Sequence, residues 1–204
     1  MKIICIGRNY ADHAKEMSSP VPTKPVFFLK PDTALLGKGQ HFYFPDFTKD
    51  LHHEIELVVK INKNGKNIDS KFAGNYYSEI GLGIDFTARD LQEEAKKKGL
   101  PWEIAKGFDN AAVVSDEFIP LTSIPNIQNI NFHLDINGKT VQKGNSTDMI
   151  FNINFIIEYV SKFMTLRTGD LLFTGTPAGV GPVKIGDELT GYFENRKILG
   201  FFIK

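Results

Sequence analysis

Two segments combine the pattern of a β-strand with acidic side chains, and they constrain the fold more than any other feature. Residues 52–57 read His-His-Glu-Ile-Glu-Leu, and residues 79–86 read Glu-Ile-Gly-Leu-Gly-Ile-Asp-Phe. Side chains alternate between the two faces of a strand, so Glu54 and Glu56 project from one face with Cα atoms about 6.6 Å apart. Ile55 and Leu57 take the other face. The strand therefore presents one acidic face and one apolar face.

A hard divalent cation is the natural partner for two acids placed side by side. Mg²⁺ and Mn²⁺ prefer carboxylate oxygens, and Asp85, at the end of the second segment, offers a third. Two alternatives stay open from the residues alone. Glu54 and Glu56 can form a solvated strand face, because charged side chains are mostly exposed. Asp85 can instead be a residue at the start of a helix with no role in metal binding, since Asp is favoured near that position.

Bulk composition narrows the classes of function. The chain has 204 residues, enough for one large domain or two small ones, with 42% hydrophobic residues. The 24 basic and 24 acidic residues balance, which disfavours a nucleic-acid partner. No apolar run reaches the roughly 20 residues of a membrane span, and we expect no membrane partner. The single cysteine, Cys5, lies in an apolar run and is predicted to be buried. We expect the protein in the cytoplasm.

Strand patterns outnumber helix patterns, which predicts a β-rich α+β fold. Asn64-Gly65 and Asn137-Gly138 are typical hairpin turns, the latter within a hairpin over 130–143. Thr168-Gly169-Asp170 and Gly186-Asp187 each read as a turn that leads into a strand. The remaining strands are predicted at 1–6, 25–30, 54–61 and 80–86.

Helices are predicted at three places. A short one covers 10–17, within a Ser/Pro-rich segment that is a candidate mobile loop. A second begins at Thr87, the expected N-cap, and ends at Gly99. A third follows Asn152 or Asn154 and carries apolar residues at helical spacing as far as Phe163. On the second helix the spacing of three polar side chains places them on one face: Arg89, Gln92 and Lys96.

Three further polar features carry possible chemistry. His13 and Glu16 have the i, i+3 spacing that places a histidine beside a carboxylate, as in a general base, although exposed helices also show such pairs by chance. Lys106 matters only if it points at the acids; a surface position is the alternative. His52 and His53 point to opposite faces, and we interpret both as structural.

The glycine loop Thr174-Gly175-Thr176-Pro177-Ala178-Gly179-Val180-Gly181 is not a P-loop, because it lacks the Gly-Lys-Ser/Thr ending. Its hydroxyl and backbone N–H groups can still hold a carboxylate.

Taken together, these segments resemble the fumarylacetoacetate hydrolase family over nearly the whole chain, most closely its short acylpyruvase-like members. The resemblance is carried by Gly-Arg-Asn-Tyr-Ala-Asp-His (7–13), Phe-Leu-Lys-Pro (28–31), His-His-Glu-Ile-Glu-Leu (52–57), Asp-Phe-Thr-Ala-Arg-Asp-Leu-Gln (85–92), Lys-Gly-Leu-Pro-Trp (98–102) with Ala-Lys (105–106), and Leu-Phe-Thr-Gly-Thr-Pro-Ala-Gly-Val-Gly (172–181). It implies a β-roll or β-sandwich with a few short helices, one catalytic domain over 1–204, a lid within 1–24, and a homodimer.

The resemblance also implies a role for each matching residue. Glu54, Glu56 and Asp85 match the ligands of Mg²⁺ or Mn²⁺, and His13 with Glu16 matches a water-activating pair on the lid. Three more residues match substrate contacts, and Lys106 matches a group beside the reacting carbonyl; the contacts are Arg8, Gln92 and Thr176.

The implied reaction is cleavage of the C3–C4 bond of an acylpyruvate, a small 2-oxo acid, to pyruvate and a carboxylic acid through an enolate. Oxaloacetate decarboxylation passes through the same enolate, and so does isomerisation or hydration of a 2-oxo dienoate. A catalytically inactive metal-binding relative is the alternative from another class. The intact His13–Glu16 pair and Lys106 argue against that last reading, because a binding module needs neither.

Overall fold

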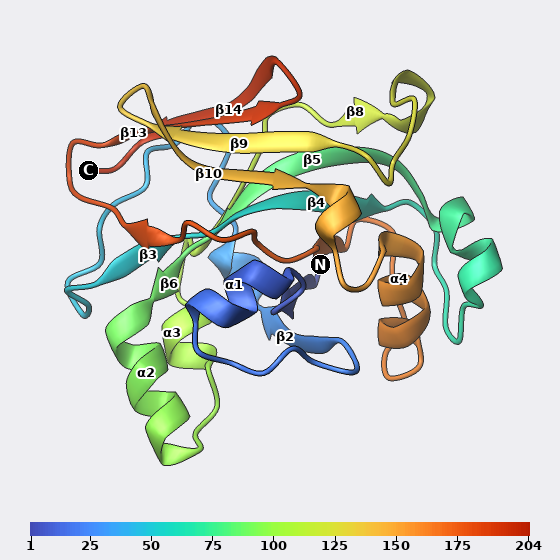
Figure 1. Ribbon diagram of the computed structural model, residues 1–204, viewed down its shortest axis with the longest axis horizontal. Coiled ribbons are helices and arrows are strands. Elements are labelled where there is room, and N and C mark those ends of the chain that lie inside the picture. Colours follow the sequence, from blue (N-terminus) through green and yellow to red (C-terminus); the bar gives the residue numbers. More distant parts are fainter.

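The computed structural model describes residues 1–204 and has a strand-rich α+β architecture with few helices (Figure 1). Two sheets form its body. The strands β9, β10, β13 and β14 cross over β4 and β5 of the larger sheet, whereas α1, α2 and α3 gather on the opposite side of β4 and β5. The fold class predicted from the sequence is thereby confirmed.

The larger sheet has seven strands in the order β2-β1-β11-β4-β5-β7, with β8 also paired to β5. Strand β1 is parallel to β11, and the other pairs are antiparallel. Most residues of β1, β4 and β5 are buried, and the sequences of these strands are correspondingly rich in Ile, Leu and Val. The bounds are β1 Ile3–Gly7, β2 Val26–Lys30, β4 Ile55–Ile61, β5 Tyr77–Asp85, β7 Ala112–Val114, β8 Ile119–Pro120 and β11 Leu171–Phe173.

The second sheet has the order β10-β9-β13-β14, and a small third sheet has the order β12-β3-β6. The β9–β10 hairpin turns at Asn137-Gly138, where both residues have positive φ (52° and 75°), as a two-residue turn of this sequence requires. The bounds are β3 Leu51–His53, β6 Thr87–Ala88, β9 Asn131–Ile136, β10 Lys139–Asn145, β12 Gly181–Pro182, β13 Glu188–Phe193 and β14 Arg196–Phe202.

The helices are short. They are α1 Ala11–Glu16, α2 Arg89–Lys98, α3 Glu103–Lys106 and α4 Ile153–Ser161, with four 3-10 turns at Asp32–Ala34, Ser70–Tyr76, Leu121–Ser123 and Ser146–Asp148. Gly99 ends α2 in the left-handed conformation (φ 66°), as predicted. The side chain of Asn152 accepts the backbone N–H of Phe155 and caps α4, which identifies the cap that the sequence left open. None of these helices is both long enough and apolar enough to cross a bilayer.

One apolar core contains residues from Ile3 to Ile203 and joins the two larger sheets. Cys5 belongs to it and is buried, as predicted. A single domain over residues 1–204 stays a prediction, and this shared core supports it.

Three local predictions are wrong. No hairpin forms at Asn64-Gly65: the backbone of Gly65 pairs instead with Leu166. A Cβ at position 65 would lie 2.4 Å from the ring of Tyr76, so close packing requires this glycine, not a turn. Helix α4 ends at Ser161, so Phe163 lies beyond it and is exposed.

Thr87 does not cap α2. It lies in β6, which pairs with β3, and its hydroxyl donates to Glu54, so Ala88 takes the cap position. The strand predicted at 54–61 is confirmed as β4, except that it begins one residue later, at Ile55. Glu54 lies between β3 and β4, where the chain passes from the small sheet to the large one.

Candidate active site

The three acids predicted as metal ligands lie together where β4, β5 and the break before β4 meet. One carboxylate oxygen from each of Glu54, Glu56 and Asp85 lies within 4.8 Å of the other two, and the three residues are 6%, 2% and 1% exposed. The backbone ties the acids together, because the N–H of Asp85 donates to the carbonyl of Glu54 (2.9 Å). The acids are therefore buried and close, which excludes the alternative of a solvated strand face.

Two buried cations hold Glu54 in place. Arg89 donates to Oε1 (2.6 Å) and Lys106 to Oε2 (2.8 Å). Burial by itself raises the pKa of the Glu54 carboxyl, but the charges of Lys106 and Arg89 outweigh it and lower that pKa well below its usual value. Lys106, whose pKa burial alone would lower, has it raised by Asp85 and Glu54. Glu54 is thus an anion in the folded protein.

Asp85 is held from two sides. Lys106 donates to Oδ2 (2.9 Å), and the fully buried ammonium of Lys30 lies 2.7 Å from Oδ1 as an ion pair without hydrogen-bond geometry. The ammonium of Lys30 donates hydrogen bonds to three backbone carbonyls, those of Phe86, Lys106 and Ala111. This buried lysine therefore links the acid at the end of β5 to the C-terminus of α3.

Glu56 differs from the other two acids because it forms no ion pair. Its Oε2 accepts the backbone N–H of Gly175 (2.6 Å), and the charges that act on it most strongly are those of Asp85 and Glu54. Burial, together with Asp85 and Glu54, raises the pKa of the Glu56 carboxyl well above its usual value.

A divalent cation fits this arrangement. Carboxylate oxygens are the ligand atoms that Mg²⁺ and Mn²⁺ prefer, and these are close enough to share one ion. The ion would also give Glu56 a positive partner, which no protein side chain provides. The two neighbouring histidines are not part of the cluster, as predicted: His53 is buried against Gln142, and His52 pairs with Asp50.

The predicted general base lies on α1. Nδ1 of His13 is 3.0 Å from Oε2 of Glu16, while Oε1 of Glu16 accepts the backbone N–H of Gly179 (3.0 Å). The pair is therefore attached to the glycine loop at 174–181. His13 is 6% exposed and lines the same cavity as the acids, so it can act on a molecule bound there.

Gln92 and Arg8 also line this cavity. Oε1 of Gln92 accepts from Arg89 (2.6 Å), and its amide nitrogen has no protein partner. Arg8 follows β1 in the left-handed conformation (φ 59°), an uncommon state for a non-glycine residue, and its guanidinium has no protein partner. Both side chains are free to donate to a ligand.

Thr176 lines the cavity too, but its hydroxyl is already occupied. Oγ1 donates to the carbonyl of Ile55 (2.8 Å) and accepts from the amide of Gln142 (2.9 Å). A carboxylate contact at Thr176 therefore falls to its backbone N–H, which has no protein acceptor.

Sequence reasoning missed several members of the site. Arg89 was placed only on a helix face, and Lys30 only in a strand, yet both contact the acids. Gln142, 1% exposed, was not singled out, although it joins His53, Ile55 and Thr176 in one buried network. The one available signal was Lys30, which stands at the end of an apolar strand. A lysine buried there requires an anionic partner, and this could have pointed to its contact with an acid.

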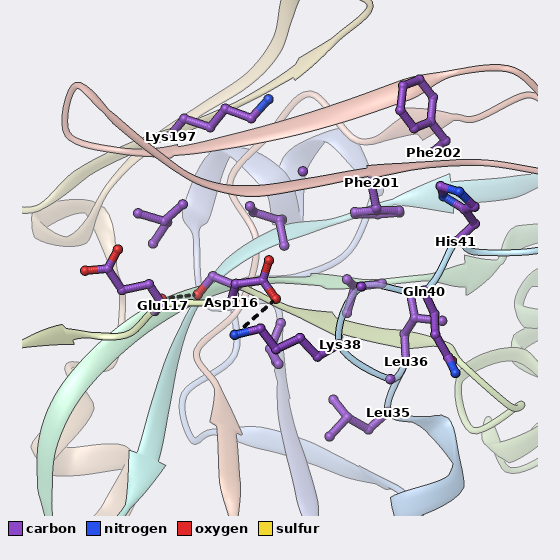
Figure 2. A pocket seen from close by; sticks show the side chains of 18 of the residues that line it. Leu35, Leu36, Lys38, Gln40, His41, Asp116, Glu117, Lys197, Phe201 and Phe202 are labelled. Atoms are coloured by element: carbon purple, nitrogen blue, oxygen red, sulfur yellow. Dashed lines mark hydrogen bonds and ion pairs between the residues drawn. The ribbon is translucent and has the colours of Figure 1, made fainter.

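The cavity over the acids measures about 40 Å³ and is far smaller than a second hollow, of about 840 Å³. That hollow lies between residues 35–41, β7 and β14, and Figure 2 shows Lys38 turned toward Asp116 at its centre. Its lining includes neither the three clustered acids nor Lys106 nor His13. The small cavity is therefore the candidate active site, because the residues that can do chemistry line it.

Comparison with known proteins assigns the chain to one family. The family model for the fumarylacetoacetate (FAA) hydrolase C-terminal domain matches residues 2–199, and the chain belongs to that family. The protein is 49% identical over 187 residues to the oxaloacetate tautomerase FAHD1, mitochondrial, of Bos taurus; the match covers 92% of this chain and 84% of the relative.

Two solved structures share the fold. A fumarylacetoacetate hydrolase family protein from Yersinia pestis CO92 has a TM-score of 0.95 and 42% identity, covering 100% of this chain and 93% of the other. Fumarylpyruvate hydrolase from Pseudomonas aeruginosa, in complex with Mn²⁺ and pyruvate, has a TM-score of 0.92 and 35% identity, covering 100% and 89%. The family resemblance inferred from the motifs is confirmed.

Proposed function

We propose that this protein is a Mg²⁺- or Mn²⁺-dependent enzyme that acts on small 2-oxo acids with a second carbonyl at C4, through the enolate of the 2-oxo acid. The observation that carries the proposal is the combination of a buried acid cluster with a histidine–glutamate pair beside the same cavity. When bound by Glu54, Glu56 and Asp85, the metal would polarise the C2 carbonyl and favour loss of a proton from C3.

The protein's own groups take the remaining roles. His13, oriented by Glu16, is the general base. The ammonium of Lys106 stabilises negative charge that develops on the substrate, at a place from which water is largely excluded. Arg8, the Gln92 amide and the backbone N–H of Thr176 bind and orient the substrate carboxylate.

Charge in the cavity favours a dianionic substrate such as oxaloacetate. Lys30, Arg89 and Lys106 balance the three acids, so a divalent ion leaves the centre with two positive charges. Arg8 and Lys96 add two cations that form no ion pair with the protein. With the similarity to an oxaloacetate tautomerase, this supports keto–enol interconversion of oxaloacetate, in which His13 removes the C3 proton. Decarboxylation would proceed through the same enolate.

Hydrolysis of acylpyruvates is the second candidate, and the His13–Glu16 pair favours it. In that reaction His13 takes a proton from water, the water oxygen attacks C4, and the C3–C4 bond breaks to release the enolate of pyruvate and a carboxylic acid. The similarity to a fumarylpyruvate hydrolase supports this reaction as well. An inactive metal-binding relative would need neither the pair nor Lys106.

Compartment and assembly belong to the proposal too. A homodimer stays a prediction, to be checked by sedimentation. The Bos taurus relative is named as mitochondrial, whereas we expected the cytoplasm from the sequence. The location of this protein therefore stays a prediction.

The test is a comparison of substrates with and without metal. The protein is treated with a chelator, then assayed with oxaloacetate, by loss of enol absorbance and by release of CO₂, and with acetylpyruvate, by release of pyruvate. We expect Mg²⁺ or Mn²⁺ to restore conversion of at least one substrate, and His13→Ala to lose most of it. Absence of any metal-dependent conversion would overturn the proposal.

A further inference from the structure

A second, apolar hollow adjoins the cavity over the acids. It measures about 270 Å³ and is lined by residues 26–29 of β2, residues 100–103, and Lys106. Figure 1 shows β2 beside α3, with α2 next to them. We call this hollow the side pocket. Its walls are mostly hydrophobic, unlike the cavity over the acids, which contains four cations and three carboxylates.

The two spaces share three residues: Phe28, Trp102 and Lys106 line both. The rings of Phe28 and Trp102 meet edge to face, with centroids 5.8 Å apart. The ammonium of Lys106 lies 5.2 Å from the Phe28 ring centroid, while it bonds to Glu54 and Asp85. Lys106 therefore connects the two spaces, with its charge on the acids and its apolar stem along the side pocket.

Charge is distributed unequally between the two spaces. Lys96, whose ammonium lies 5.7 Å from the Trp102 ring centroid, belongs to the cavity over the acids and not to the side pocket. The only other charged group of the side pocket is Glu103, which is exposed and would repel a carboxylate. The side pocket thus disfavours an anionic substituent and accommodates an apolar one.

We infer that the side pocket receives the substituent on C4 of the substrate, and that it selects acylpyruvates with an apolar or aromatic acyl group. This inference rests on the proposed function and deepens it. The 2-oxo acid head stays over the acids beside Lys106, and the acyl group extends past Phe28 and Trp102 against Leu100. Oxaloacetate has no substituent beyond its C4 carboxylate, and that carboxylate faces Lys96 at the edge of the charged cavity.

The volumes are consistent with this division. The cavity over the acids measures about 40 Å³ and the side pocket about 270 Å³, so the side pocket is the space that can take a propyl or phenyl group. Each methylene moved from water into such a site contributes roughly a fourfold gain in affinity. We therefore expect kcat/KM to increase about tenfold or more from a methyl to a propyl substituent on C4.

The test uses two exposed aliphatic residues that differ in position. Leu100 is 52% exposed and lines the side pocket, whereas Ile104 is 75% exposed and does not. The variants Leu100→Asp and Ile104→Asp introduce the same charge near the same helix, so Ile104→Asp is the matched control. A second pocket variant, Leu29→Asp, places the charge on another wall of the side pocket, so that a folding defect at Leu100 can be told apart from an effect of charge in the pocket. Rates are measured for acylpyruvates with methyl, propyl and phenyl on C4, and for oxaloacetate.

Leu100→Asp is expected to lose about tenfold in kcat/KM for the propyl and phenyl substrates and to leave the methyl substrate and oxaloacetate near wild type. Ile104→Asp should resemble the wild type with all four. Equal kcat/KM for all C4 substituents in the wild type, or an equal loss in both variants, would overturn the inference. Conversion of the methyl substrate or oxaloacetate without selectivity would leave the proposed function standing.

A binding measurement tests the pocket even if no substrate is converted. Oxamate presents the 2-oxo acid head, and N-propyl oxamate adds an apolar tail at the position of C4. With Mn²⁺ present, calorimetry should show N-propyl oxamate binding about tenfold more tightly than N-methyl oxamate in the wild type and in Ile104→Asp. The advantage should be lost in Leu100→Asp. Equal affinities in the wild type would exclude the side pocket as the acyl site.

Discussion

The floor of the candidate active site and its lid are attached to the protein in very different ways. On the floor, Glu54 and Asp85 each contact two buried cations, and their backbones are joined. The predicted lid, residues 8–23, is held mainly by its first residues, where Tyr10 is buried and pairs with Met149 and the carbonyl of Asn9 accepts the N–H of Ile150. There Asn9, fully buried, bonds through its side chain to the backbone of Phe151 and Thr174.

Further along the lid, Glu16 makes one bond to the main body, to the N–H of Gly179. Gly179 has a positive φ (99°), and a Cβ there would lie 2.6 Å from the carbonyl oxygen of Val141. Only glycine fits at that position, so the loop that donates to Glu16 has a fixed geometry, whereas residues 17–23 of the predicted lid are exposed or half-buried. We therefore expect the floor to bind a metal independently of the predicted lid, which carries the proposed base His13.

Removal of Glu56 should produce the largest effect, because it takes a ligand from the floor and leaves Glu54 and Asp85 paired with the protein's own cations. We expect Glu56→Ala to lose nearly all Mg²⁺ or Mn²⁺ binding in calorimetry, and with it the metal-induced increase in melting temperature that follows from ligand binding to the folded state. Glu93→Ala, on the exposed side of α2, is the matched control. Equal metal affinity in Glu56→Ala and wild type would disprove the floor as the metal site.

Removal of His13 should leave the floor intact. General bases contribute roughly 10²–10⁴-fold to rates, so His13→Ala should lose hydrolysis by that order while metal affinity stays near wild type. Decarboxylation of oxaloacetate needs no attacking water and should decrease less. His41→Ala removes an exposed histidine beside the large hollow of Figure 2 and should change neither property. If His13→Ala hydrolyses acetylpyruvate at the wild-type rate, the histidine–glutamate pair is not the base.

The smallest expected effect is a change in the dynamics of the lid. Oxalate presents the chelating oxygens of enolpyruvate, so with Mg²⁺ it should bind more tightly than pyruvate. It should also slow hydrogen exchange in residues 8–23, because a ligand in the cavity gives the lid a second attachment. Oxalate without metal should have little effect, and exchange in β4 should not change. Identical exchange in the lid with and without Mg²⁺–oxalate would show that it does not close over a ligand.

Much of this molecule could be predicted from sequence where a local rule determines the outcome. Alternation along a strand placed Glu54 and Glu56 together, the Asn137-Gly138 turn set the β9–β10 hairpin, and Gly99 ended α2. Local rules failed where distant residues compete. Gly65 reads as a turn but is required by packing against Tyr76, and Thr87 reads as a cap but donates to Glu54.

The sequence by itself determined the acidic residues, the His13–Glu16 pair and the family, because each is carried by short motifs that can be read one at a time along the chain. Only the tertiary structure decided how charge is distributed among them. Lys30 and Lys106 are 55 and 21 residues from Asp85, yet both contact it, and Glu56 alone lacks a cation. The side pocket likewise arises only where β2 meets residues 100–103. Electrostatics and packing depend on distances in space, which the order of residues along the chain does not specify.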